Sequence, residues 1–141
     1  MQISPNFDLR EYLHPDVWNQ FGASSIWFLD PRLYTINQCL RDRHGQVTIN
    51  DWLWEGSFVD SGFNLYRKIG ADYSQHKFGK ATDSKFKNIS ADEVREDILK
   101  HQRFWLEMGL TTLESADYAP TWVHLDTRYT GRNEILIVKP N

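Results

Sequence analysis

The sequence predicts an α+β fold in a single domain spanning residues 1–141, with N-terminal helices packed on a small, mainly antiparallel sheet. Three observations support this prediction. The length suits one domain. Helix start and stop patterns gather in the first part of the chain, and three strand-like runs, at 110–114, 121–127 and 134–138, close it. A composition that is 40% hydrophobic supplies the side chains for a packed core.

The expected helices are marked by residues that cap helix ends. A short helix is expected over residues 8–13, a second over 15–22, a third over 30–45 and a last one over 90–109. The last begins with a capping box, in which Ser90 can accept from the Glu93 amide while Glu93 reaches back. Because each of the last three is followed or ended by a glycine, their C-terminal boundaries are the best defined.

Two further strands are expected before the last helix. Residues 46–50 alternate in polarity as a strand does, and residues 80–86 could form a short strand. The intervening residues 51–79 show no clean period. A loop of that length in a small domain is more often functional or partly structured than idle.

Composition and charge exclude several classes of protein. The net charge is −3, the pI is about 5.9 and no long basic run occurs, so bulk charge predicts no binding to nucleic acid or anionic membranes. Cys39 is the only cysteine, which rules out an internal disulfide. The N-terminal residues lack the features of a signal peptide, and no apolar run is long enough to span a bilayer. We expect a monomer made in the cytoplasm.

Three residues have the chemistry of a metal site. Zinc takes nitrogen and carboxylate ligands and keeps one position open when it is catalytic, and His76, Asp83 and His124 satisfy that count. Gly79 permits a tight turn that could bring His76 and Asp83 to one point. Spacing alone leaves open a structural interpretation, with a loop histidine, a turn-capping aspartate and a hydrogen-bonded core histidine.

The segments that hold these residues resemble a known family. Residues 74–83 read Ser-x-His-x-x-Gly-x-Ala-x-Asp, which resembles the signature of the D-Ala-D-Ala carboxypeptidase family of zinc peptidases, and Trp-Val-His-Leu-Asp at 122–126 resembles its second signature. Residues 6–13 and 47–50 resemble the phage endolysin branch. The resemblance implies a hedgehog-like fold, a Zn²⁺ ion held by His76, Asp83 and His124, and hydrolysis of peptidoglycan stem peptides.

The sequence offers two candidates for the residue that transfers protons. Many members of the family place a carboxylate three residues before the last histidine, where this chain has Thr121. Other branches place it at the end of the preceding strand, which favours Glu114 as the general base, with Asp117 as its rival. Asp126 is expected to be structural or to support a ligand.

The substrate contacts are expected in the long loop. Members of the family often hold the substrate carboxylate with an arginine there, and the first arginine of this loop is Arg67. Ser74 could contact a ligand or substrate, although a local turn role is equally open. The loop aromatics, which could line the cleft or belong to the core, are Trp52, Trp54, Phe58 and Phe63.

Two functions of different classes therefore remain. The first is a zinc metallopeptidase that cleaves D-Ala-D-Ala or L-Ala-D-Glu bonds of the cell wall, encoded by a phage or prophage, or a dipeptidase acting on small D,D-dipeptides. The second is a non-catalytic binding module that retains the peptidase fold. Thr121 and the absence of arginine from residues 52–64 favour the second.

Overall fold

The structure is a computed structural model that describes residues 1–139. Its α-helices are α1 (Pro15–Phe21), α2 (Arg32–His44), α3 (Ala91–Lys100) and α4 (Gln102–Met108). Its 3-10 turns are η1 (Leu9–Tyr12), η2 (Gly22–Phe28), η3 (Trp52–Trp54) and η4 (Gln75–Phe78). Its strands are β1 (Gln2–Ser4), β2 (Phe7–Asp8), β3 (Val47–Thr48), β4 (Ala81–Phe86), β5 (Thr112–Glu114), β6 (Val123–Asp126) and β7 (Leu136–Val138).

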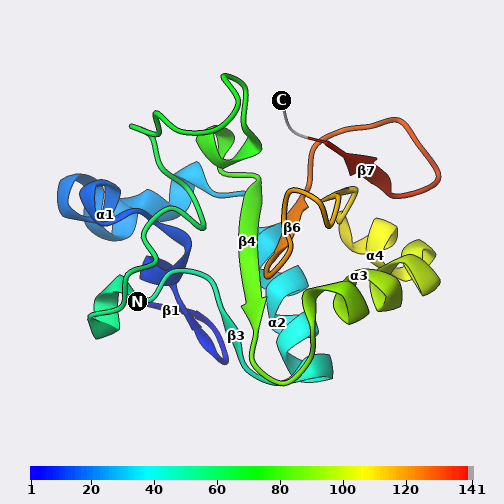
Figure 1. Cartoon of the computed structure of the whole chain (residues 1–141). Coiled ribbons are helices and arrows are strands. Elements are labelled where there is room, and N and C mark those ends of the chain that lie inside the picture. The colour runs from blue at the N-terminus through cyan, green and yellow to red at the C-terminus, as the bar shows by residue number, and fades with distance from the viewer. Residues whose placement is uncertain (140–141) are drawn as a thin grey trace.

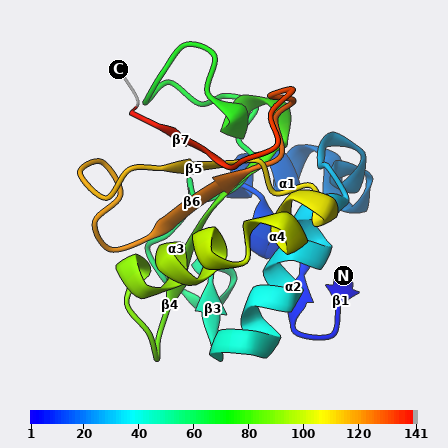
Figure 2. The ribbon, with the colours of Figure 1, turned by 90° about the vertical axis from the view of Figure 1, so that its right-hand side faces the viewer.

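The main sheet has the strand order β3-β4-β6-β5-β7 (Figure 1 and Figure 2). Every neighbouring pair is antiparallel except β5 and β7, which run parallel. β1 and β2 form a separate antiparallel pair. The described residues thus confirm the predicted α+β class with a mainly antiparallel sheet.

The two faces of the sheet have different roles. On one face Thr82 and Ser84 of β4 bond Asn37 of α2, at 3.1 and 2.7 Å, and the helices α2, α3 and α4 lie on this side (Figure 2). Successive strand residues point to opposite faces, so Asp83 lies on the other face, together with its pairing partner His124. The long loop before β4 runs beside the edge of that strand, where the Asp83 amide donates to the Ser61 carbonyl at 2.7 Å.

The core fills the space between the sheet and its helices. Leu113 of β5 and Leu125 of β6 pair across the sheet and are fully buried. From the helices the core receives Leu33, Ile36, Leu40, Val94, Ile98 and Trp105. The apolar side chains of β5 and β6 point to this face of the sheet. Their polar neighbours in sequence therefore point to the opposite face of the sheet.

Most predicted helix ends are confirmed. Asp8 caps η1 with Glu11 completing a capping box, Pro15 opens α1, and Gly45 follows α2. Ser90 accepts from the Glu93 amide as expected.

Three features of the secondary structure differ from what was predicted. The single helix expected over 90–109 is broken at His101, whose backbone leaves helical geometry, and the change of direction lets α4 pack against α2. The hairpin of β1 and β2 was not expected, because strands of two or three residues carry no readable period. The strand expected over 46–50 is reduced to Val47–Thr48.

Within residues 1–139, no helix has the length and apolar character needed to cross a membrane.

Candidate metal centre

The two strand-borne members of the site are neighbours, as predicted. β4 and β6 pair so that Asp83 lies directly opposite His124. In an antiparallel pair, residues that face each other across the ladder point to the same side. The sheet itself therefore places the carboxylate of one strand beside the imidazole of the other.

His76 reaches the same point from a turn. The turn η4 begins at Ser74, whose Oγ accepts from the His76 amide at 3.3 Å, and ends at Gly79, which has φ 68°. A side chain at Gly79 would overlap the carbonyl oxygen of Phe28, so both the backbone conformation and the space require glycine. The tight turn expected at this glycine is present, and it directs His76 back towards the start of β4.

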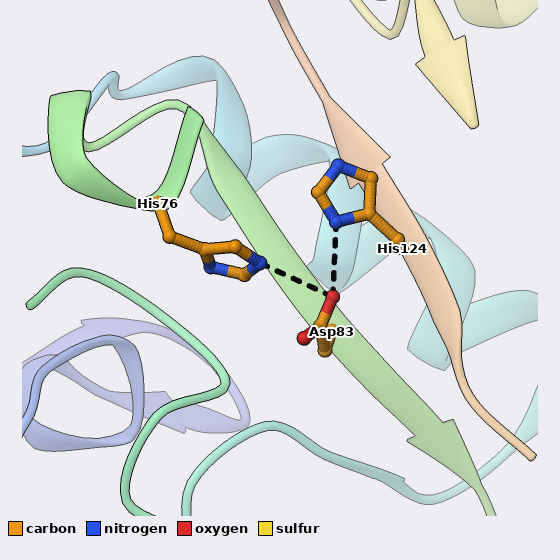
Figure 3. Close-up of side chains that lie close together, drawn as sticks. All are labelled: His76, Asp83 and His124. Carbon is orange, nitrogen blue, oxygen red and sulfur yellow. Dashed lines mark hydrogen bonds and ion pairs between the residues drawn. The ribbon is translucent and has the colours of Figure 1, made fainter. Parts of the chain in front are cut away.

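The three side chains converge on one small volume (Figure 3). His76 Nε2 lies 3.3 Å and His124 Nδ1 lies 3.0 Å from Asp83 Oδ1. One ligand atom from each residue lies within 4.8 Å of the other two. Ligands arranged tetrahedrally about an ion at 2.0–2.1 Å are roughly 3.3 Å apart, so these separations suit a metal ion.

The remaining ring nitrogens indicate how the histidines are held. His76 Nδ1 lies 2.9 Å from the Gly62 carbonyl, and His124 Nε2 lies 2.9 Å from Asp126 Oδ2. Each ring thus faces an acceptor with both nitrogens, although a neutral imidazole carries one N–H. A divalent ion among the three ligand atoms satisfies the same contacts with two neutral rings, and the donor set therefore fits a metal.

The electrostatics reflect the same crowding of carboxylates and imidazoles. Burial favours the neutral form of His124, but Asp126, Asp83 and Glu114 outweigh it and hold its pKa far above the ordinary value. Burial likewise favours the protonated form of Asp83, and the two histidines outweigh it and keep its pKa well below the usual range. The site thus stabilises positive charge beside an ionised Asp83.

Glu114 lies at the same point. Its Oε1 is 3.1 Å from His124 Nδ1, because β5 pairs with β6 and ends beside the site. Its neighbour Leu113 pairs with Leu125 on the core side, so Glu114 points to the opposite face of the sheet, which carries His124. Asp117 and Thr121 are exposed in the connection between β5 and β6. Glu114 is accordingly the carboxylate placed to act on a molecule held at the metal site.

A pocket of about 450 Å³ opens over the three ligands and Glu114. Its walls add cationic and aromatic side chains that the sequence analysis had not assigned to the site, except for Arg67. These wall residues are Arg67, Tyr73, Trp122, Arg128 and Lys139. A pocket with this lining suits a polar, anionic ligand.

The predicted substrate contacts have mixed outcomes. Arg67 and Ser74 both line the pocket, and Arg67 Nη1 also donates to the Asp60 carbonyl at 2.7 Å. The four loop aromatics do not line this pocket. Phe63 is buried and stacks on Phe28, and the Trp52 indole donates to the Leu13 carbonyl at 2.8 Å.

The sequence analysis missed other parts of the site. The Gly62 carbonyl is a backbone atom in a loop, which no residue type marks. Arg128 could have been found, because it follows Asp126 by two residues as an ion-pair partner and the segment is strand-like. Comparisons with protein-family models, curated proteins and solved structures found no match to this chain. Function therefore has to be argued from the geometry.

Proposed function

We propose that this protein is a zinc-dependent peptidase that hydrolyses peptide bonds in peptidoglycan stem peptides. The observation that supports the proposal best is the meeting of His76, Asp83 and His124 with Glu114 at the floor of one pocket. Two histidines, one carboxylate ligand and a separate carboxylate form the minimal equipment of a zinc hydrolase.

The roles follow from position. His76, Asp83 and His124 would hold Zn²⁺, which supplies a Lewis acid that polarises a scissile carbonyl and lowers the pKa of a bound water molecule. Glu114 would accept the proton of the attacking water and return it to the leaving amine. Glu114 Oε1 lies 3.1 Å from His124 Nδ1, so this carboxylate would lie beside the bound ion.

The pocket walls support an anionic peptide as substrate. The side chain of Arg67 lines the pocket and is held in place by the hydrogen bond from its Nη1 to the Asp60 carbonyl. Such an arginine would bind a substrate carboxylate with little loss of side-chain freedom. Stem peptides carry free carboxylates beside their D-alanine and D-glutamate residues, and this agrees with the resemblance of residues 74–83 to the D-Ala-D-Ala carboxypeptidase signature.

The test is digestion of purified peptidoglycan, with products identified by mass spectrometry. The wild type should release peptides in the presence of zinc and none after chelation. Glu114→Gln should retain zinc but lose about 10²–10⁴-fold in rate, because it removes the proton acceptor and keeps the shape. Asp117→Asn is the matched control and should remain active.

The outcomes separate the competing functions. If Glu114→Gln is as active as the wild type and Asp117→Asn is inactive, Asp117 is the base. If the wild type binds peptidoglycan without cleaving it, the non-catalytic module, which Thr121 favours, is correct. If only free D,D-dipeptides are cleaved, the substrate is the small dipeptide.

A further inference from the structure

The ring nitrogen of His124 that does not face Asp83 contacts an ion pair between Asp126 and Arg128. Asp126 is fully buried and places Oδ2 2.9 Å from His124 Nε2. Arg128 forms a two-pronged ion pair with the same carboxylate. Its Nε donates to Oδ1 at 2.9 Å, and its Nη2 donates to Oδ2 at 2.6 Å. The Arg128 amide adds a third contact, to Oδ1 at 3.3 Å.

This arrangement selects the tautomer of the neutral His124 ring. A carboxylate paired with arginine only accepts hydrogen bonds, so a neutral ring keeps its proton on Nε2 and presents the lone pair of Nδ1. Nδ1 is the nitrogen that faces Asp83 and Glu114. We infer that Asp126 and Arg128 are a positioning pair that sets the tautomer and orientation of His124 for metal binding, and this inference rests on the proposed metal site.

Arg128 has a separate part in the pair. It donates to both oxygens, so the carboxylate cannot rotate away from His124 without losing a charge-assisted hydrogen bond. Its side chain is 31% exposed and also lines the pocket, whereas Asp126 is inaccessible. The pair thus connects the pocket wall to a metal ligand, and partners of this kind typically change metal affinity by about 10–100-fold.

Asp126→Asn is the sharpest test because it keeps the size of the side chain. If the amide oxygen stays beside His124, the amide NH₂ faces the Nε and backbone donors of Arg128. If the NH₂ turns towards His124, it donates to Nε2 and moves the ring proton to Nδ1, the nitrogen required by the metal. Either arrangement should weaken metal binding. Removing Arg128 as well frees the amide oxygen to accept from Nε2, so the double variant should recover part of the affinity.

The experiment measures Zn²⁺ affinity of the full chain by competition with a chromophoric chelator, without substrate. Asp126→Asn should bind about 10–100-fold more weakly than the wild type, and Arg128→Ala about tenfold more weakly. Asp126→Asn with Arg128→Ala should bind more tightly than Asp126→Asn alone. The matched control is Asp8→Asn, because Asp8 pairs with Arg10 at the same spacing and with the same two-pronged geometry, away from the site. It should leave zinc affinity unchanged.

The results discriminate between the two proposals. Wild-type affinity in Asp126→Asn, or no recovery in the double variant, overturns the positioning role. If Asp126→Asn fails to fold by circular dichroism, Arg128→Ala decides, and unchanged affinity in it overturns the role. A wild type that binds no zinc overturns both the metal site and the positioning pair. A wild type with the expected affinities that cleaves no peptide supports the pair and refutes only the peptidase.

Discussion

The two histidines of the site rest on supports of different construction. His124 lies in β6, where every residue is buried and β4 and β5 pair on either side. His76 lies in a four-residue turn, η4, and its ring is fixed by a backbone carbonyl, that of Gly62. One support is a ladder of repeated hydrogen bonds, and the other depends on a few individual contacts.

The difference indicates where the site is vulnerable. In β6 the backbone of His124 is specified redundantly, since losing one ladder bond leaves the others in place. In η4 the direction of His76 depends on its cap, Ser74, and on the glycine that ends the turn, Gly79. Substitutions that leave the core intact should therefore affect metal binding more on the His76 side.

Among substitutions that test this difference between the two supports, Gly79→Ala should have the largest effect. Alanine would have to adopt φ 68° and would overlap the Phe28 carbonyl oxygen. The left-handed conformation costs about 1–2 kcal/mol and a forced contact about 1–3 kcal/mol more. The free energy of unfolding, measured by urea denaturation, should fall by about 2–5 kcal/mol, and zinc affinity should fall with it because His76 is displaced.

Gly70→Ala separates the two causes. Gly70 also has positive φ, 78°, but the nearest atoms to an added Cβ belong to the flexible side chain of Arg67, 3.8 Å away. Its cost should be limited to about 1–2 kcal/mol. Equal losses for the two variants would show that the close approach to Phe28 contributes nothing and that the positive φ alone requires glycine at position 79.

The second prediction concerns Asp30, which contacts both the turn that carries His76 and the residue that follows β6. Its amide donates to the Gly79 carbonyl at 2.8 Å, and its carboxylate accepts from Thr127 Oγ1 at 2.6 Å, just beyond β6. Burial raises the pKa of Asp30, but the hydrogen bonds from Arg32 and Thr127 outweigh it and lower the pKa from 3.8 to about 2. Lys80, 3.8 Å away, adds positive charge.

The sign of the pH dependence follows from the lowered pKa. Asp30 stabilises the fold fully above about pH 4, and this stabilisation is lost as the pH falls towards 2. Because Arg32 is 47% exposed, the contribution is about 1–2 kcal/mol. Chemical denaturation should find Asp30→Asn less stable than the wild type by that amount at pH 6, with the difference vanishing near pH 2.

Asp97→Asn is the control for this prediction. The pKa of Asp97 is also lowered to about 2, chiefly by its hydrogen bond to Arg43, and it lies away from the site. It should show the same pH signature with unchanged zinc affinity, whereas Asp30→Asn should also weaken zinc binding. If neither variant changes zinc affinity, the side chain of Asp30 does not connect the two supports.

The same contrast explains how much of the fold the sequence could predict. Helix ends were predictable because caps such as Ser90 act within three or four residues. β4 and β6 were predictable as neighbours because the expected zinc site requires Asp83 and His124 to lie close together. The path of residues 51–63 was not, because it is fixed by Asn50, a fully buried side chain that bonds the Leu13 carbonyl and the Ser61 amide far along the chain.

The candidate site also has parts that could be predicted from the sequence and parts that could not. Its side-chain ligands and Glu114 were named from spacing, resemblance and strand alternation, and the structure brings them together. The parts that escaped prediction are a backbone atom, the Gly62 carbonyl, and wall residues such as Tyr73 and Trp122, whose approach depends on loop conformation. Local patterns identify the chemistry of a site, whereas its enclosure depends on contacts distant in sequence.

The smallest expected effect belongs to Ser74→Ala, which decides between two roles for this residue. As the cap of η4, Ser74 contributes one hydrogen bond to the His76 amide, and its loss should cost about 0.5–1 kcal/mol in urea denaturation. Ser90→Ala is the matched control, since it removes the cap of α3 at a distance from the pocket. If Ser74 is only a cap, the two variants should lose similar stability and KM should stay at the wild-type value in both. A raised KM for Ser74→Ala with unchanged stability would instead make Ser74 a substrate contact, and the His76 support would then depend on Gly79 and the Gly62 carbonyl alone.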